Sequence, residues 1–180
     1  MKKILGIFML IAGIVIAVGA SSANFAYFEA NRTVHVQVVP DDNELIDLKP
    51  LQPYAYIGKG GTLIIALNTK NTNWKKGFGE GVSPDSLYVF EEVFGVSNHL
   101  WEDMPICVKV VYAEQAGDIL FFTGDYVPGA GQKQLKFTVP HGGFVKIGMI
   151  LDSTGLEDED VFKGDLLITA DAGACPEEGG

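Results

Sequence analysis

Short runs in which apolar and polar residues alternate make up most of this 180-residue chain, and glycine, proline, aspartate or asparagine separates them. Thr33–Val39 and Lys133–Val139 are the clearest runs, and their period of two is that of a strand with one buried face. Further β-like runs are Tyr54–Ile57, Thr62–Leu67, Ile106–Ala113, Asp118–Thr123, Phe144–Leu151 and Asp165–Ala170. Eight or nine short strands with turn residues between them predict an all-β fold, an antiparallel β-sandwich. The turn residues 114–117 favour a hairpin between the two runs that flank them.

One segment departs from the period of two. Leu87, Phe90 and Phe94 recur at helical spacing. Ser83-Pro84 before them is typical of a helix N-cap followed by proline at the first helical position. We therefore expect one short helix over residues 84–92, at one end of the sandwich.

A basic, apolar leader precedes all of these runs. Lys2-Lys3 is followed by the uncharged, mostly apolar stretch Ile4–Ala20 and then by small residues. This order is typical of a secretory signal peptide with a cleavage site after Ala23 or Ala20. We expect signal peptidase to remove residues 1–23, so that the rest of the chain is secreted to the cell surface or beyond. An uncleaved membrane anchor is the alternative, because the apolar stretch is near the lower length limit for spanning a bilayer.

The chain that remains without the leader has the length of one domain and an acidic composition. We expect one sandwich domain over residues 24–172 and a loose C-terminal tail over residues 173–180. The formal net charge of −10 argues against nucleic acid or an anionic membrane as partner, because both require a basic surface. Membrane contact is then expected only through the leader before it is cut.

Two cysteines, Cys107 and Cys175, lie in a chain that is expected to reach an oxidising compartment. They are candidates for a disulfide that ties the tail to a core strand, worth roughly 4 kcal/mol in the chain-entropy model. Cys107 lies in an apolar run, so a buried free thiol is the alternative.

The chain carries no recognisable catalytic motif. His35, His99 and His141 lack the spacing of a zinc site, and no serine lies in a Gly-x-Ser-x-Gly motif. The glycine-rich segment 77–81 lacks the lysine of a phosphate-binding loop and is interpreted as a mobile loop. We therefore expect a protein that is not an enzyme and that binds no cofactor, with Ca²⁺ as the one candidate ion.

An acidic stretch between the last two expected strands is the candidate Ca²⁺ site, because Ca²⁺ accepts irregular cages of oxygen ligands. The candidate ligands are Asp152, Asp158, Asp160 and Asp165. A solvated acidic loop without metal is the alternative.

Asn31-Arg32-Thr33 is an N-glycosylation sequon. Asn31 is therefore a candidate glycosylation site in a secreted chain. A glycan there would lie at the start of the first expected strand.

Phe25-Ala26-Tyr27-Phe28 directly follows the leader, and a lysine-rich leader with such an aromatic segment resembles the TasA/camelysin-like secreted proteins of biofilm matrices. The rest of the chain is similar to a family of short archaeal secreted proteins of uncharacterised function that are related to that group. The residues that carry this similarity are Thr33–Val39 with Pro40-Asp41-Asp42, Ser83–Phe94 with Val96-Ser97-Asn98, Val145–Leu151 with Asp152-Ser153-Thr154-Gly155, and Gly164–Ala172.

The resemblance implies a jelly-roll-like sandwich whose copies assemble into an extracellular, pilus-like fibre. The N-terminal segment of one subunit, residues 24–39, would complete the sheet of the next by donor-strand exchange. An unpaired sheet edge is a template for such a strand, and a head-to-tail contact propagates as a filament. The residues expected to enter the neighbouring subunit are Phe25, Tyr27, Phe28, Val34, Val36 and Val38.

A cell-surface binding module for glycan or Ca²⁺ is the alternative function. Its working parts would be Trp74 and Trp101, together with the acidic stretch. Ordinary core packing is the other interpretation of each tryptophan. A secreted peptidase is the third candidate function. Some members of the family that the chain resembles carry a metallopeptidase label, but this chain has no zinc-binding motif.

Overall fold

The computed structural model describes residues 33–176, apart from residue 35 and segments 114–117, 159 and 161–163. The chain divides into two units, Met1–Gln37 and Val38–Gly180. The sandwich described below lies in the second unit.

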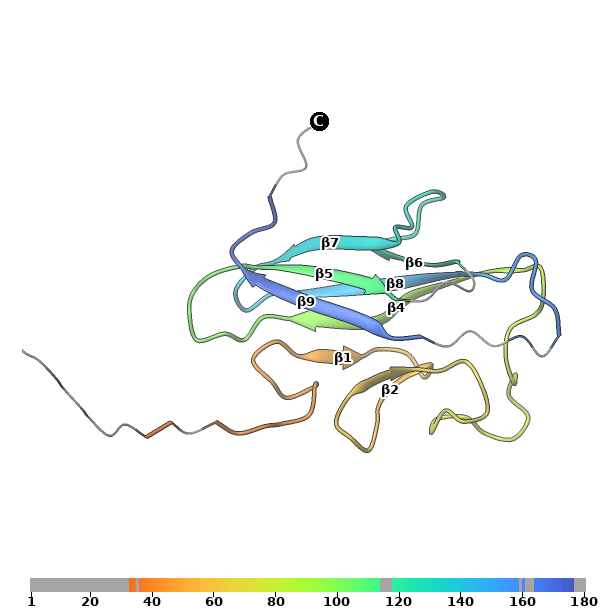
Figure 1. The fold of residues 1–180 in the computed structure, drawn as a ribbon, viewed down its shortest axis with the longest axis horizontal. Coiled ribbons are helices and arrows are strands. Elements are labelled where there is room, and N and C mark those ends of the chain that lie inside the picture. The colour runs from red at the N-terminus through yellow and green to blue at the C-terminus, as the bar shows by residue number, and fades with distance from the viewer. Residues whose placement is uncertain (1–32, 35, 114–117, 159, 161–163, 177–180) are drawn as a thin grey trace, which may run out of the picture. The chain divides into compact units, whose positions relative to one another are not determined.

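The described residues contain nine strands and no helix, so the all-β prediction is confirmed (Figure 1). The strands are β1 (Leu48–Pro50), β2 (Ala55–Ile57), β3 (Leu63–Ile65), β4 (Leu87–Ser97), β5 (Ile106–Tyr112), β6 (Asp118–Thr123), β7 (Gln134–Val139), β8 (Phe144–Asp152) and β9 (Leu166–Ala172). Each strand predicted from Tyr54 onward is present, and its ends agree with the prediction to within two residues.

Two antiparallel sheets form the layers of the sandwich. One sheet has the strand order β1-β4-β8-β6 and the other has the order β7-β5-β9. The short strands β2 and β3 form a separate hairpin, and β1 and β2 lie at one side of the layers (Figure 1). The expected hairpin across residues 114–117 is wrong, because β5 and β6 belong to different sheets.

The core lies between the inner faces of the two sheets. On β5 the buried residues Ile106, Val108 and Val110 alternate with Cys107 and Lys109, which keep partial solvent contact on the outer face. The opposite layer contributes Phe94, Val96, Phe121, Ile147 and Met149, all buried. Burial of one such side chain contributes roughly 1.5–3 kcal/mol. The period of two in β5 therefore reflects one face buried in the core and one face outside it.

The helix predicted over residues 84–92 is wrong, because these residues lead into and form the first half of β4. In an extended strand Leu87 and Phe90 point to opposite faces, and Leu87 is exposed. The pairing of β4 with β8 shifts register between Phe90 and Phe94, and Glu92 adopts a φ of 55° inside this bulge. The bulge interrupts the alternation of inward and outward residues along β4. The apolar residues on either side of it therefore recur at a spacing that resembles that of a helix.

Two aromatic rings on the outer face of the first sheet cover glycines of neighbouring strands. A Cβ atom at Gly148 would lie 2.2 Å from the Phe122 ring, and one at Gly95 would lie 2.1 Å from the Phe144 ring. Phe122 is fully buried although it lies on β6 opposite Gly148. The outer face of this sheet therefore has a small packed layer of its own.

Asp41 joins the first residues of the sandwich unit to β1 and β3. Its carbonyl oxygen accepts a hydrogen bond from the Leu48 amide at 2.6 Å, and its Oδ2 accepts one from the Leu63 amide at 2.8 Å. Its own amide donates to the Gly61 carbonyl at 2.8 Å. This aspartate therefore orients the segment that carries β1 along the edge of β4.

Candidate functional site

The segment proposed from the sequence as a donor strand is not part of any sheet where the structure describes it. Residues 33–39, apart from residue 35, have no strand assignment, so the strand predicted over Thr33–Val39 is wrong for the isolated subunit. Val34 and Val36 are each 82% exposed and Val38 is 93% exposed. Three alternate valines of this segment therefore face solvent.

The other N-terminal predictions lie outside the described residues. These concern the leader 1–23, the aromatic residues Phe25, Tyr27 and Phe28, and the sequon at Asn31. Where the structure is described, it holds no helix that is both long and apolar enough to cross a membrane.

Among the residues that the structure describes, β9 has the longest free edge of the two main sheets, seven residues against six for β7. It pairs with β5 along its whole length and is the last strand in the order β7-β5-β9. The edge of β6, in contrast, is bridged, because Phe121 and Gln132 exchange two backbone hydrogen bonds of 2.9 Å. Leu167 on β9 is 55% exposed. A free edge of seven residues can accept another strand by backbone hydrogen bonding.

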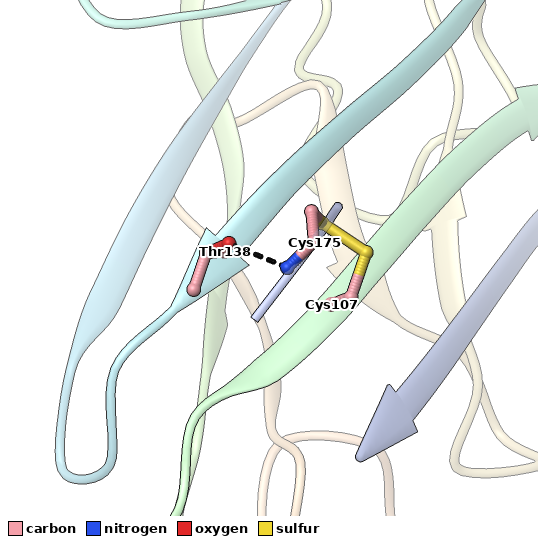
Figure 2. Close-up of a disulfide and its surroundings, with 3 residues drawn as sticks. All are labelled: Cys107, Thr138 and Cys175. Atoms are coloured by element: carbon pink, nitrogen blue, oxygen red, sulfur yellow. Dashed lines mark hydrogen bonds between the residues drawn. A yellow bond between two sulfur atoms is a disulfide. The ribbon is translucent and has the colours of Figure 1, made fainter. Parts of the chain in front are cut away.

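Of the two alternatives for the cysteines, the structure contains the disulfide. Figure 2 shows Cys107 of β5 bonded to Cys175 of the tail, with a Cα–Cα distance of 4.6 Å. The Cys175 amide also donates to the Thr138 hydroxyl of β7 at 2.9 Å. The tail thus passes from β9 over β5 to β7 on the outer face of the sheet. It is fixed as far as Cys175, rather than loose over its whole length.

The four candidate Ca²⁺ ligands are not brought together. Among the described residues, no three His, Cys, Asp or Glu side chains are grouped so that they could hold a metal ion. The Asp152 carboxylate accepts from the Thr154 amide at 2.9 Å, and hydrogen bonding by Thr154 lowers the pKa of Asp152. The Asp160 carboxylate accepts from the Glu157 amide at 2.8 Å. Asp158 is exposed, and the Asp165 carbonyl accepts from Ala113 at 3.0 Å. Two of these carboxylates therefore cap their own turns, which is a structural role.

A charged group beside β1 was not expected from the sequence. Asp47 is buried, and its Oδ2 lies 3.1 Å from Lys49 Nζ and 3.4 Å from His99 Nε2. Partial burial raises the pKa of the nearby Glu44 carboxyl, and the negative charges of Asp41 and Asp47 raise it further. This group attaches β1 electrostatically to the residues that follow β4.

A pocket of about 420 Å³ lies between the loop that follows β3 and the first half of β4. Its lining residues are Pro53, Tyr54, Ala66, Leu67, Asn68, Asn71, Asn73, Trp74, Phe78, Gly79, Gly81, Val82, Tyr88 and Phe90. Five of them are aromatic and three are asparagines, and none carries a charge at neutral pH. Trp74 was a candidate binding residue from the sequence, and the glycine-rich segment 77–81 was interpreted as a mobile loop. Phe78, Gly79 and Gly81 of that segment form part of the pocket wall.

Hydrogen bonds to the backbone build the polar side of this pocket. The buried Asn71 amide donates to the Pro53 carbonyl at 3.0 Å and to the Ala66 carbonyl at 2.7 Å, and its Oδ1 accepts from the Asn73 amide at 2.8 Å. The Asn73 side chain donates to the same Pro53 carbonyl at 2.9 Å. These bonds fix the loop after β3 against the segment before β2.

Aromatic contacts and further hydrogen bonds build the opposite side. The Phe90 ring lies 5.1 Å from Tyr54 in an edge-to-face contact and 6.1 Å from Tyr88 in a stacked contact. Trp74 Nε1 donates to the Gly79 carbonyl at 3.0 Å. The Tyr88 hydroxyl accepts from the Ser83 amide at 2.9 Å, and hydrogen bonding by Ser83 lowers the pKa of Tyr88. Trp101, the other tryptophan, is 91% exposed and does not line the pocket.

Comparison with known proteins gives a family but no described function. No curated protein matches the chain, and no solved structure matches it. The family described as "Protein of unknown function (DUF1102)" matches residues 38–175. This range starts where the sandwich unit starts and ends at the second cysteine of the disulfide. Since the match covers more than half of the chain, the protein belongs to the DUF1102 family.

Proposed function

We propose that this protein is a secreted structural subunit that polymerises into an extracellular filament or biofilm-matrix fibre. Residues 24–39 of one subunit would add as a strand to the sheet of the next. The observation that carries the proposal is the exposure of Val34, Val36 and Val38, which have the alternation of a strand but no strand partner in the described part of the chain.

Burial of these valines supplies the driving force. A valine transferred from water to an apolar environment contributes roughly 1.5–3 kcal/mol before the cost of ordering the segment. Backbone hydrogen bonds to an edge strand add affinity, and the alternate side chains set the register. Because donor segment and acceptor edge differ, the contact does not close and extends into a filament.

The outer edge of β9 is the acceptor that we propose. Within the described residues it offers seven residues without a second neighbour in the sheet, against six for β7 and three for β1, and Gln132 bridges the β6 edge. An unprotected edge of this length is a pairing hazard unless a partner covers it.

The leader and the disulfide support secretion. A disulfide persists in oxidising compartments outside the cytoplasm, and signal peptidase would act on residues 1–23 before the chain reaches them. The resemblance of the leader and of residues 25–28 to TasA/camelysin-like matrix proteins supports a structural role. The partner of the protein is then a further copy of itself.

Electron microscopy and analytical ultracentrifugation of the secreted protein test the proposal. We expect filaments from the intact protein, and none after replacement of Val34, Val36 and Val38 by serine. The matched control replaces Thr33 and Gln37 by serine, since these residues would lie on the other face of the added strand. A protein that stays monomeric under all conditions, or a serine variant that still forms filaments, would contradict the proposal.

A second pair of variants tests the acceptor. Leu167→Lys puts a charge on β9 and is expected to weaken assembly. Leu87→Lys is the control, because Leu87 is 58% exposed against 55% for Leu167 but lies on β4. Equal loss of assembly in both variants would contradict the choice of β9.

A surface binding module is the second candidate function, and the aromatic pocket favours its glycan form. The Ca²⁺ form has no comparable support, because the candidate carboxylates are not grouped among the described residues.

A further inference from the structure

We infer that the pocket between the loop after β3 and the first half of β4 binds the uncharged pyranose ring of an oligosaccharide. The inference deepens the second candidate function and does not rest on filament assembly. Every lining residue lies within the sandwich unit, away from the proposed donor segment in the sequence.

The charge of the lining selects a neutral ligand. The chain has a net charge of −10, yet the pocket contains no Asp, Glu, Lys, Arg or His. A phosphate, carboxylate or amine entering this site would lose water without gaining a partner of opposite charge. An uncharged ligand avoids that cost.

The aromatic side chains supply the apolar part of the recognition. Tyr54 and Phe78 are exposed, and Trp74 is half-buried, so large ring surfaces remain available to a ligand. Packing of the C–H face of a sugar ring on such surfaces removes apolar area from water on both sides. Sites for small molecules combine such surfaces with a few fixed polar groups.

The polar groups left over in the pocket suit hydroxyls. Asn68 Nδ2, Asn73 Oδ1 and the Tyr54 hydroxyl make no hydrogen bond within the described part of the chain. The Tyr88 hydroxyl accepts a hydrogen bond and keeps its own proton to donate. A mixture of donors and acceptors matches sugar hydroxyls, which both donate and accept. A purely apolar ligand would leave these groups without partners, which disfavours it.

The pocket is formed before any ligand arrives. Asn71 is buried and uses both hydrogens of its amide group on backbone carbonyls, so its role is to hold the loop. The bond between Trp74 and Gly79 fixes the indole against the glycine-rich segment. A preorganised wall lowers the entropy cost of binding, and about 420 Å³ lies within the usual size range of small-molecule sites.

Tryptophan fluorescence gives a direct test, because the chain has only two tryptophans. Trp101→Phe leaves Trp74 in the pocket as the single indole. We would titrate this secreted variant with neutral oligosaccharides of glucose, N-acetylglucosamine, mannose, galactose and xylose, and with uronic acid oligosaccharides. The expected result is a saturable change of Trp74 emission with at least one neutral sugar.

Calorimetry on pocket variants then locates the site. With the neutral sugar found by fluorescence, Trp74→Ala and Phe78→Ala are expected to raise Kd by about tenfold or more. Phe78→Ala is the safer variant, since the exposed ring of Phe78 makes no hydrogen bond. Trp101→Ala is the matched control and should leave Kd unchanged.

Three results would overturn the inference. The first is the absence of binding to every neutral oligosaccharide, and the second is binding of uronic acid oligosaccharides alone. The third is neutral sugar binding that survives both pocket substitutions. Filament formation by Trp74→Ala protein, scored in parallel, separates failure of this site from failure of the assembly proposal.

Discussion

The amide of Ser86 donates a hydrogen bond to the hydroxyl oxygen of Ser153 at 3.0 Å, across the entrance to β4. The Ser153 hydroxyl is within reach of the carbonyls of Ser83 at 2.7 Å and Ser86 at 2.8 Å, and its single proton serves one of them at a time. The Ser153 amide donates to the Ser86 carbonyl at 2.9 Å. One fully buried serine after β8 therefore positions the whole segment that leads into β4.

Ser153→Ala is expected to lower the free energy of unfolding by about 1–3 kcal/mol, because it leaves the Ser86 amide and a carbonyl without their buried partner. Urea denaturation followed by circular dichroism measures the change. Thr72→Ala is the control, because Thr72 is exposed on the loop after β3. A Ser153→Ala protein as stable as the control would contradict this role.

Gly148→Ala is expected to destabilise the protein by about 1–3 kcal/mol or more, because the new methyl group would overlap the Phe122 ring. Combining it with Phe122→Leu should recover part of the loss, since the smaller side chain can move aside. Thermal unfolding of the single and double variants gives the coupling. Gly60→Ala is the control, because nothing lies within 4 Å of a Cβ atom at Gly60. A full, additive loss in the double variant would contradict the steric explanation.

The strands that sequence analysis predicted are those with one face on the core. β5 and β7 keep a period of two because every second residue is buried between the sheets. β6 and β8 are apolar runs in which consecutive residues, such as Phe121 and Phe122, are buried. The first half of β4 was predicted as part of a helix over residues 84–92, because the bulge between Phe90 and Phe94 breaks the period of two. β1 was missed because it has only three residues. It is held by antiparallel pairing with Phe94–Val96 of β4 and by the hydrogen bond from the Leu48 amide to the Asp41 carbonyl.

The pocket could be predicted only in part, because its shape depends on contacts between distant segments. The Asn71 side chain holds the loop by donating hydrogen bonds to the carbonyls of Pro53 and Ala66, and no local sequence pattern predicts these partners. The run Asn71-Thr72-Asn73-Trp74, with polar amides next to an aromatic residue, is the one sequence signal that indicates a binding loop. The segments around Ser83 and Ser153 are distant in the sequence, and the Ser153 hydroxyl joins them by lying 2.7 Å from the Ser83 carbonyl.

Replacement of both cysteines by serine is expected to reduce the free energy of unfolding by about 2–4 kcal/mol, because the disulfide closes a loop with a sequence separation of 68 residues. Urea denaturation of the wild type with and without reductant should reproduce the effect. The double serine variant, which has no disulfide to lose, is the control and should not respond to reductant. A loss of less than about 0.5 kcal/mol in the free energy of unfolding would contradict a stabilising role of this disulfide.

Glu44→Gln is expected to stabilise the protein at neutral pH and to have little effect in acid. The folded state raises the pKa of the Glu44 carboxyl above its ordinary value, through partial burial first and then through repulsion by Asp41 and Asp47. Folding therefore favours the protonated form, and stability is lost as the pH rises from the unfolded pKa through the raised folded pKa. Glutamine stays neutral, so the variant avoids this loss. Thermal unfolding at about pH 7 and about pH 3 measures the difference.

Glu80→Gln, on an exposed loop, removes the same charge and is the control. An equal gain for both variants at neutral pH would indicate a net-charge effect, and a Glu44→Gln gain that persists in acid would contradict the titration of Glu44.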